Sequence, residues 1–162
     1  MGLQTYKAPQ EIAHGQDGVI FKIAKDLVAK IGYFDSETKH ESEIAGRLYK
    51  AGISVPIPYG MHQIEFPNKE YSFKLPFKEG GIFEGFVMER IVGKTGFELG
   101  ILSSEMKEAM ILLNEEIRKA IEMGFQPKDE KYFGNFIFTS DEKIKLLDFT
   151  SWSYRDILVP QS

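Results

Sequence analysis

Residues 125–150 read FQPKDEKYFGNFIFTSDEKIKLLDFT, and the expected architecture is built around them. The stretch holds two short apolar runs, 136–138 and 144–147, joined by a polar segment. This pattern predicts a β-hairpin. Asn135 stands just before the first run and Asp148 just after the second, so strand pairing brings an amide oxygen and a carboxylate to the same end. Hard oxygen ligands of this kind suit Mg²⁺ with bound phosphates.

The composition predicts one folded, soluble domain. Of the 162 residues, 43% are hydrophobic and 27% charged, which is the balance of a globular protein with a single core. A formal charge of -4 argues against broad nucleic-acid binding, which needs many cations to neutralise phosphates. The absence of cysteine excludes disulfides and thiolate metal sites. We find no signal peptide and no apolar run long enough to span a membrane, so we expect a cytoplasmic protein of undetermined oligomeric state.

Residues 12–23 form an apolar segment, a glycine-containing turn and an alternating run, which predicts two strands joined by a tight loop. Because glycine lets a backbone approach phosphate oxygens closely, Gly15 and Gly18 are candidates for a phosphate-binding loop. Two glycines three residues apart mark an ordinary hairpin turn more often than a nucleotide loop. This pattern alone leaves both interpretations open.

A short strand at 26–31 carries Lys30 between apolar neighbours, and a helix is predicted at 37–51. Glu41 falls on the apolar face of that helix, whereas Glu43 faces elsewhere. We therefore prefer Glu41 as the partner of Lys30. The alternative is a solvated lysine on an edge strand.

These features, in this order and spacing, resemble the protein-kinase-like superfamily. In that family a strand lysine and a helix carboxylate follow a glycine-rich loop, and a catalytic Asp precedes a metal-binding Asn and a hairpin that leads to Asp-Phe-Gly. Residues 51–60 resemble the junction after this helix in RIO-type and aminoglycoside-phosphotransferase-like kinases. Two features depart from the pattern: no His/Arg-x-Asp signature precedes Asp129, and Thr150 replaces the glycine of Asp-Phe-Gly.

The resemblance implies an α+β fold in one domain, 1–162, with an N-lobe at 1–90 and a strongly reduced C-lobe at 91–162. We expect the N-lobe to be a five-stranded antiparallel sheet with the one helix at 37–51. We expect the C-lobe to be built on a helix at 105–123 and the hairpin at 136–147. Only twelve residues follow Thr150, so we expect no activation loop, and the extent resembles the small bacterial effector kinases of the OspG type.

The resemblance also implies ATP with one or two Mg²⁺ ions, which Asn135 and Asp148 would hold. Met88 corresponds to the gatekeeper, and the backbones of Glu89 and Ile91 would face the adenine edge. The nucleotide-binding residues implied in this way are Ile12, Gly15, Gly18, Ile20, Val28, Lys30, Met88, Glu89, Ile91, Ile137 and Leu147.

The catalytic base is ambiguous, because the family's spacing from Asn135 gives Glu130 while the family's Asp-x-Lys motif gives Asp129. We favour Asp129 as base and Lys131 as the clamp on the γ-phosphate, since one extra loop residue is sterically easy next to a glycine. Lys30 and Glu41 complete the implied catalytic set. The alternative for 128–131 is a solvated charge cluster without a catalytic role.

The function that the resemblance implies is a minimal protein serine/threonine kinase with a protein substrate, delivered to a host cell if it is an effector. The alternatives are a pseudokinase or nucleotide-binding interaction module, and then a small-molecule kinase. A reduced C-lobe weighs against the last, because related small-molecule kinases build their acceptor pocket there.

Overall fold

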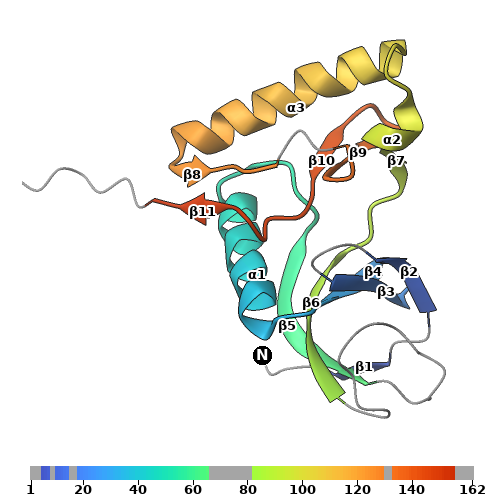
Figure 1. Cartoon of the computed structure of the whole chain (residues 1–162), viewed down its shortest axis with the longest axis vertical. Coiled ribbons are helices and arrows are strands. Elements are labelled where there is room, and N and C mark those ends of the chain that lie inside the picture. Colours follow the sequence, from blue (N-terminus) through green and yellow to red (C-terminus); the bar gives the residue numbers. More distant parts are fainter. Residues whose placement is uncertain (1–4, 8–9, 15–17, 66–81, 130–132, 156–162) are drawn as a thin grey trace, which may run out of the picture. The chain divides into compact units, whose positions relative to one another are not determined.

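The computed structural model describes residues 5–7, 10–14, 18–65, 82–129 and 133–155, and it has the mixed α+β composition expected (Figure 1). The chain forms two compact units. The first comprises Met1–Glu43 and Ile57–Arg90, and the second comprises Ile44–Pro56 and Ile91–Ser162. None of the helices in the described ranges is long and apolar enough to cross a membrane.

The first unit contains a six-stranded sheet in the order β1-β5-β6-β4-β3-β2. Its strands are β1 (Thr5–Lys7), β2 (Gln10–His14), β3 (Gly18–Ala24), β4 (Leu27–Gly32), β5 (Pro58–Glu65) and β6 (Ile82–Glu89). All neighbours are antiparallel except β1, which runs parallel to β5. The prediction of a five-stranded antiparallel sheet is therefore wrong at this edge, because β1 pairs its backbone with β5 and adds a sixth strand.

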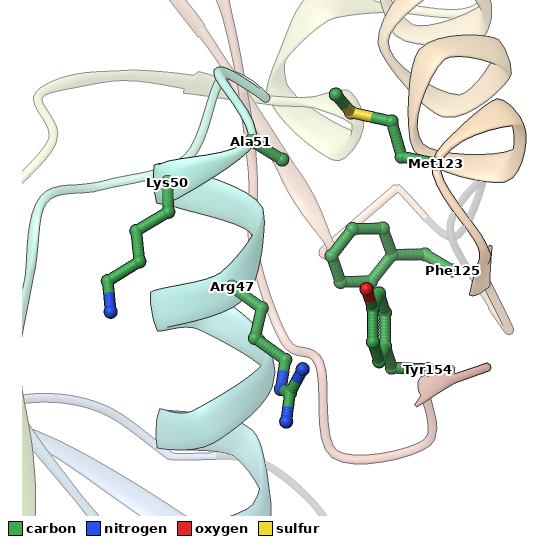
Figure 2. A pocket seen from close by; sticks show the side chains of 6 residues that line it. All are labelled: Arg47, Lys50, Ala51, Met123, Phe125 and Tyr154. Atoms are coloured by element: carbon green, nitrogen blue, oxygen red, sulfur yellow. The ribbon is translucent and has the colours of Figure 1, made fainter. Parts of the chain in front are cut away.

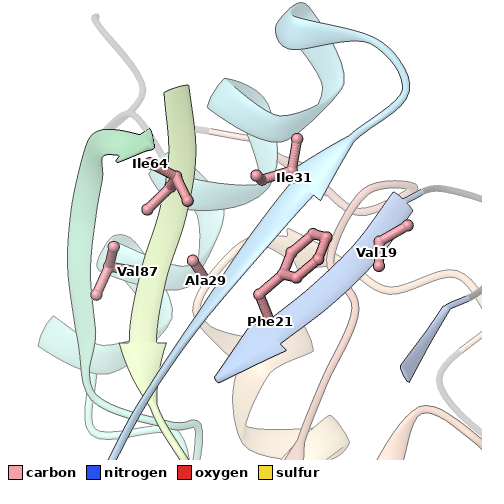
Figure 3. Close-up of a cluster of buried hydrophobic side chains, with 6 residues drawn as sticks. All are labelled: Val19, Phe21, Ala29, Ile31, Ile64 and Val87. Carbon is pink, nitrogen blue, oxygen red and sulfur yellow. The ribbon is translucent and has the colours of Figure 1, made fainter. Parts of the chain in front are cut away.

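The register of the sheet separates its side chains into two faces. One face carries a buried apolar cluster, in which Val19 lies opposite Ile31 and Phe21 opposite Ala29 (Figure 3). The full cluster is Val19, Phe21, Ala29, Ile31, Ile64 and Val87. The alternate positions of β3 and β4, which include Lys30, face the other side of the sheet.

Helix α1 (Asp35–Lys50) begins two residues before and ends one residue before the predicted helix, and the boundary between the units falls within it after Glu43. Its buried side chains Glu41, Ile44 and Leu48 recur at helical spacing, so the predicted inward face is confirmed. Acidic residues occupy the first turn and basic residues the last, which complements the helix dipole.

In the second unit, α2 (Gly96–Leu99) precedes the long helix α3 (Ser104–Glu122), which lies one residue earlier at each end than predicted. The Ser103 hydroxyl caps α3 by accepting from the amide of Met106 at 3.0 Å. The buried side chains of α3 are Met106, Ala109, Leu113, Ile117 and Ala120, whereas Ile121 is 55% exposed.

Strands β9 (Phe136–Thr139) and β10 (Ile144–Leu146) are antiparallel, so the predicted hairpin is confirmed. Strand β7 (Gly93–Thr95) adds to the other edge of β9. Strands β8 (Phe125–Gln126) and β11 (Ser153–Tyr154) form a separate antiparallel pair. In the hairpin turn the Thr139 hydroxyl donates to the Asp141 carboxylate, and this hydrogen bond lowers the pKa of Asp141.

Substitution of Gly18 tests the packing of β3 on β4. A Cβ at Gly18 would stand 2.4 Å from the Ile31 carbonyl oxygen, so we expect Gly18→Ala to cost about 1–3 kcal/mol in the free energy of unfolding. Apart from its chain neighbours and the backbone of its own helix, Gly46 in α1 has no atom within 4 Å of its Cβ position, so Gly46→Ala should instead stabilise by about 1 kcal/mol. Urea denaturation of both variants measures the difference, and equal effects would contradict the packing described.

Candidate functional site

In the first unit the candidate site is centred on a buried ion pair between β4 and α1. Lys30 Nζ lies 2.7 Å from Glu41 Oε1, and the two side chains are 10% and 3% exposed. Glu43 is exposed, so of the two carboxylates considered from sequence Glu41 is the partner. A buried pair contributes little net stability, because desolvation offsets most of the attraction. The geometry therefore favours a role in holding the lysine in one position.

The strand register gathers three further predicted nucleotide-binding residues on the Lys30 face of the sheet. Ile20 is directly opposite Lys30, and Val28 is directly opposite Met88. Val28 is buried, whereas Ile20 and Met88 are partly exposed. Because side chains alternate along a strand, these residues form one apolar surface around the lysine. Ile12 belongs to β2, at the irregularity where its register shifts.

The predicted phosphate loop is described at one glycine only, since Gly15 lies outside the described residues. Gly18 is the first residue of β3 and pairs with Gly32. The space that its Cβ would need is filled by the backbone of Ile31 and Gly32. Close strand approach is therefore a sufficient reason for glycine at this position, and a phosphate is not needed to explain it.

Glu89 ends β6 and is tied to Ile57 by two hydrogen bonds. Its N–H donates to the Ile57 carbonyl at 2.9 Å, and its carboxylate accepts from the Ile57 N–H at 3.1 Å. An adenine contact by the backbone of Glu89 would therefore have to use its carbonyl. Ile91, the other predicted adenine contact, begins the following segment of the second unit and is partly exposed.

In the second unit the β9–β10 hairpin places Asn135 and Asp148 at its same end. Leu146 pairs with Phe136, and one step further the N–H of Leu147 donates to the Asn135 carbonyl at 2.8 Å. Asp148 follows immediately. The register thus brings the backbones of both predicted metal ligands together, as the sequence pattern indicated. Ile137 and Leu147, predicted to lie below adenine, are both partly exposed.

Asp129 is joined to this end of the hairpin by a side-chain hydrogen bond. The Asn135 Nδ2 donates to the Asp129 carbonyl at 3.0 Å, and the Asp129 side chain is exposed. The Asp129 backbone has a φ of 58°, in the left-handed region. Using the amide nitrogen in this bond leaves the Asn135 amide oxygen as the group that a cation would contact. Glu130 and Lys131 lie outside the described residues.

Asp148 also has a left-handed backbone, with a φ of 58°. Its Oδ1 accepts from the Thr150 hydroxyl at 2.9 Å, and the buried rings of Phe149 and Trp152 pack edge to face at 5.2 Å just after it. In the sequence, Thr150 is a departure from the Asp-Phe-Gly pattern. Its hydroxyl instead supplies an orienting hydrogen bond that glycine lacks, and a Thr two residues after an Asp was the available signal.

The short β8–β11 ladder, which the sequence did not predict, connects the two aspartate segments. Ser153 pairs with Gln126 and Tyr154 with Phe125. Gln126 stands three residues before Asp129, and Ser153 stands five residues after Asp148. The ladder therefore fixes the chain before Asp129 and after Asp148, while the hairpin fixes it after Asp129 and before Asp148.

No protein-family model matches the chain, and none of the curated proteins matches its sequence. Within the described ranges, no three His, Cys, Asp or Glu side chains gather in a way that could hold a metal ion. One asparagine and one aspartate offer oxygen donors of the type that Mg²⁺ takes when phosphates complete its coordination.

Removing the Glu41 charge tests the buried ion pair. We expect Glu41→Gln to lower the free energy of unfolding by roughly 3–5 kcal/mol, because it leaves the buried ammonium opposite a neutral amide. The exposed pair between Lys39 and Glu84, whose side chains are 57% and 48% exposed, gives the control. Lys39→Met should cost less than about 1 kcal/mol.

The double variant Lys30→Met/Glu41→Leu should recover most of this loss, since it removes both buried charges. Denaturant unfolding measures the free energy of unfolding of each variant. A Glu41→Gln loss no larger than that of Lys39→Met would show that the Lys30 and Glu41 charges are solvated rather than buried.

Proposed function

We propose that the chain is an ATP-dependent phosphotransferase, a small protein serine/threonine kinase. The observation that carries the proposal is backbone strain at both predicted aspartates. Among the described non-glycine residues, only Asp129, Glu142 and Asp148 have positive φ. Glu142 lies in the hairpin turn, where left-handed residues are ordinary. Asp129 and Asp148 lie outside such a turn.

A left-handed conformation costs a non-glycine residue about 1–2 kcal/mol, somewhat less for aspartate. Such strain persists where surrounding contacts impose it, and it clusters at functional sites. Here Asn135 holds the Asp129 carbonyl and Thr150 holds the Asp148 carboxylate. The strain thus supports a role in which the directions of both carboxylates matter.

The residues present fit an ATP site with Mg²⁺. Asp148 and the Asn135 amide oxygen would hold the metal, which when bound neutralises phosphate charge. Lys30, positioned by Glu41, would contact the α- and β-phosphates. Asp129 would orient the acceptor hydroxyl and receive its proton as the hydroxyl oxygen bonds to the γ-phosphorus and the bond to the β–γ bridging oxygen breaks.

A protein hydroxyl is the favoured acceptor because the Asp129 side chain is exposed. Sites for small molecules usually enclose most of the ligand surface. An acceptor presented on a protein segment needs only local access to the carboxylate. This exposure supports the serine/threonine class over a small-molecule acceptor.

A second candidate is an interaction module that binds nucleotide without transferring phosphate. Large apolar side chains are exposed in the second unit, including Leu102 at 92%, Ile101 at 74% and Ile111 at 68%. Exposed apolar side chains that gather in one region favour a partner surface. Transfer of phosphate distinguishes the two candidates.

Phosphotransfer from labelled ATP to a generic acceptor such as casein, with Mg²⁺ present, tests the proposal. We expect Asp129→Asn to lower the rate by about 10²–10⁴-fold, because it removes the proton acceptor. Asp148→Asn should abolish transfer, because it removes the carboxylate that would hold the metal. Asp141→Asn, at the exposed turn of the same hairpin, should leave the rate unchanged.

Thermal unfolding of each variant would show that all three remain folded. Stabilisation of the wild type by ATP with Mg²⁺, without transfer to casein or to itself, would favour the interaction module. Absence of both stabilisation and transfer would contradict a nucleotide site altogether.

A further inference from the structure

The second unit carries an open groove, and none of the predicted catalytic residues is among its described lining residues. It has a volume of about 370 Å³. Its lining residues come from the end of α1, the end of α3 and the β8–β11 ladder (Figure 2): Arg47, Lys50, Ala51, Met123, Phe125 and Tyr154. The groove therefore has two positively charged side chains beside apolar ones, and we call Phe125 and Tyr154 its aromatic wall.

The charge of the groove is opposite to that of the chain. Arg47 and Lys50 line it, and none of its described lining residues is acidic, whereas the whole chain has a formal charge of -4. Among the described residues, neither cation forms an ion pair with a carboxylate. The helix dipole accounts for basic residues in the last turn of α1. It gives no reason for aromatic residues to stand beside them.

The aromatic wall holds Arg47 in place. The guanidinium lies 4.6 Å from the centre of the Tyr154 ring, and that ring packs 4.8 Å from Phe125, which is buried. A stacked guanidinium keeps its N–H donors available to a carboxylate while losing less freedom on binding. Met123, 43% exposed, adds an adaptable apolar contact.

We propose that this groove docks an acidic segment of a partner protein, with carboxylates on Arg47 and Lys50 and an adjacent apolar side chain against Met123 and Tyr154. Charge complementarity selects an acidic occupant. Two cations on an acidic chain are too few for nucleic acid. An open groove suits a peptide better than a small ligand that must be enclosed. The proposal does not depend on phosphate transfer.

An array of short immobilised peptides tests the proposal, with leucine or phenylalanine placed beside runs of glutamate and each peptide repeated with glutamine. The whole chain should be retained by glutamate peptides over their glutamine counterparts. The best peptide, labelled and titrated by fluorescence anisotropy, should bind Lys50→Glu on the order of tenfold more weakly than wild type. Lys50→Gln should give an intermediate loss.

Lys107→Glu is the matched control, because Lys107 is an exposed α3 lysine sixteen residues before Met123, roughly 24 Å along the helix. It should change affinity less than about twofold, and thermal unfolding should show every variant folded. Equal retention of glutamate and glutamine peptides would overturn the proposal, as would equal losses in Lys50→Glu and Lys107→Glu. A wild-type dimer in sedimentation that Lys50→Glu dissociates would assign the groove to a second copy instead.

Discussion

The buried contact between Lys30 and Glu41 is the constraint on which the first unit depends. Two charges held 2.7 Å apart and almost fully removed from water are tolerated only where the surrounding elements fix both ends. The β3–β4 and β4–β6 registers fix the lysine, and the apolar phase of α1 fixes the glutamate. The same registers place the apolar positions Ile20, Val28 and Met88 on the face of the sheet that carries Lys30. The burial of Lys30 and its ion pair exclude the alternative of a solvated lysine on an edge strand.

The second unit depends on backbone register rather than on charge. The hairpin aligns the residue before β9 with the residue after β10. The β8–β11 ladder pairs the segment that precedes Asp129 with the segment that follows Asp148. Asp129 and Asp148 lie between the β8–β11 ladder and the β9–β10 hairpin, and both adopt left-handed conformations that an aspartate does not prefer. The hydrogen bonds from Asn135 and Thr150 then orient them. A strained carboxylate with a defined direction is costly as scaffold but useful for holding a cation or receiving a proton.

Local patterns allowed much of this arrangement to be predicted. The hairpin, both long helices and the choice of Glu41 over Glu43 follow from alternation and helical phase, which act within a few residues. The edge strand β1, the third strand β7 and the β8–β11 ladder were missed, because segments of two or three residues carry no period and their partners are distant in sequence. The steric need for Gly18 and the Thr150 hydrogen bond were missed for a related reason. Both depend on which backbone or carboxylate lies next to them in the folded chain.

The proposed metal site, at the end of the β9–β10 hairpin that carries Asn135 and Asp148, can be tested directly with a paramagnetic ion. Mn²⁺ takes the same oxygen ligands as Mg²⁺ and broadens nearby amide resonances in NMR spectra. With ATP and a trace of Mn²⁺, the amides of Asn135 and Asp148 should lose intensity. Omitting ATP should remove the effect, because the metal shares its coordination with phosphates. Unchanged intensity at Asn135 and Asp148, or equal broadening by Mn²⁺ alone, would contradict a metal–nucleotide site at this end of the hairpin.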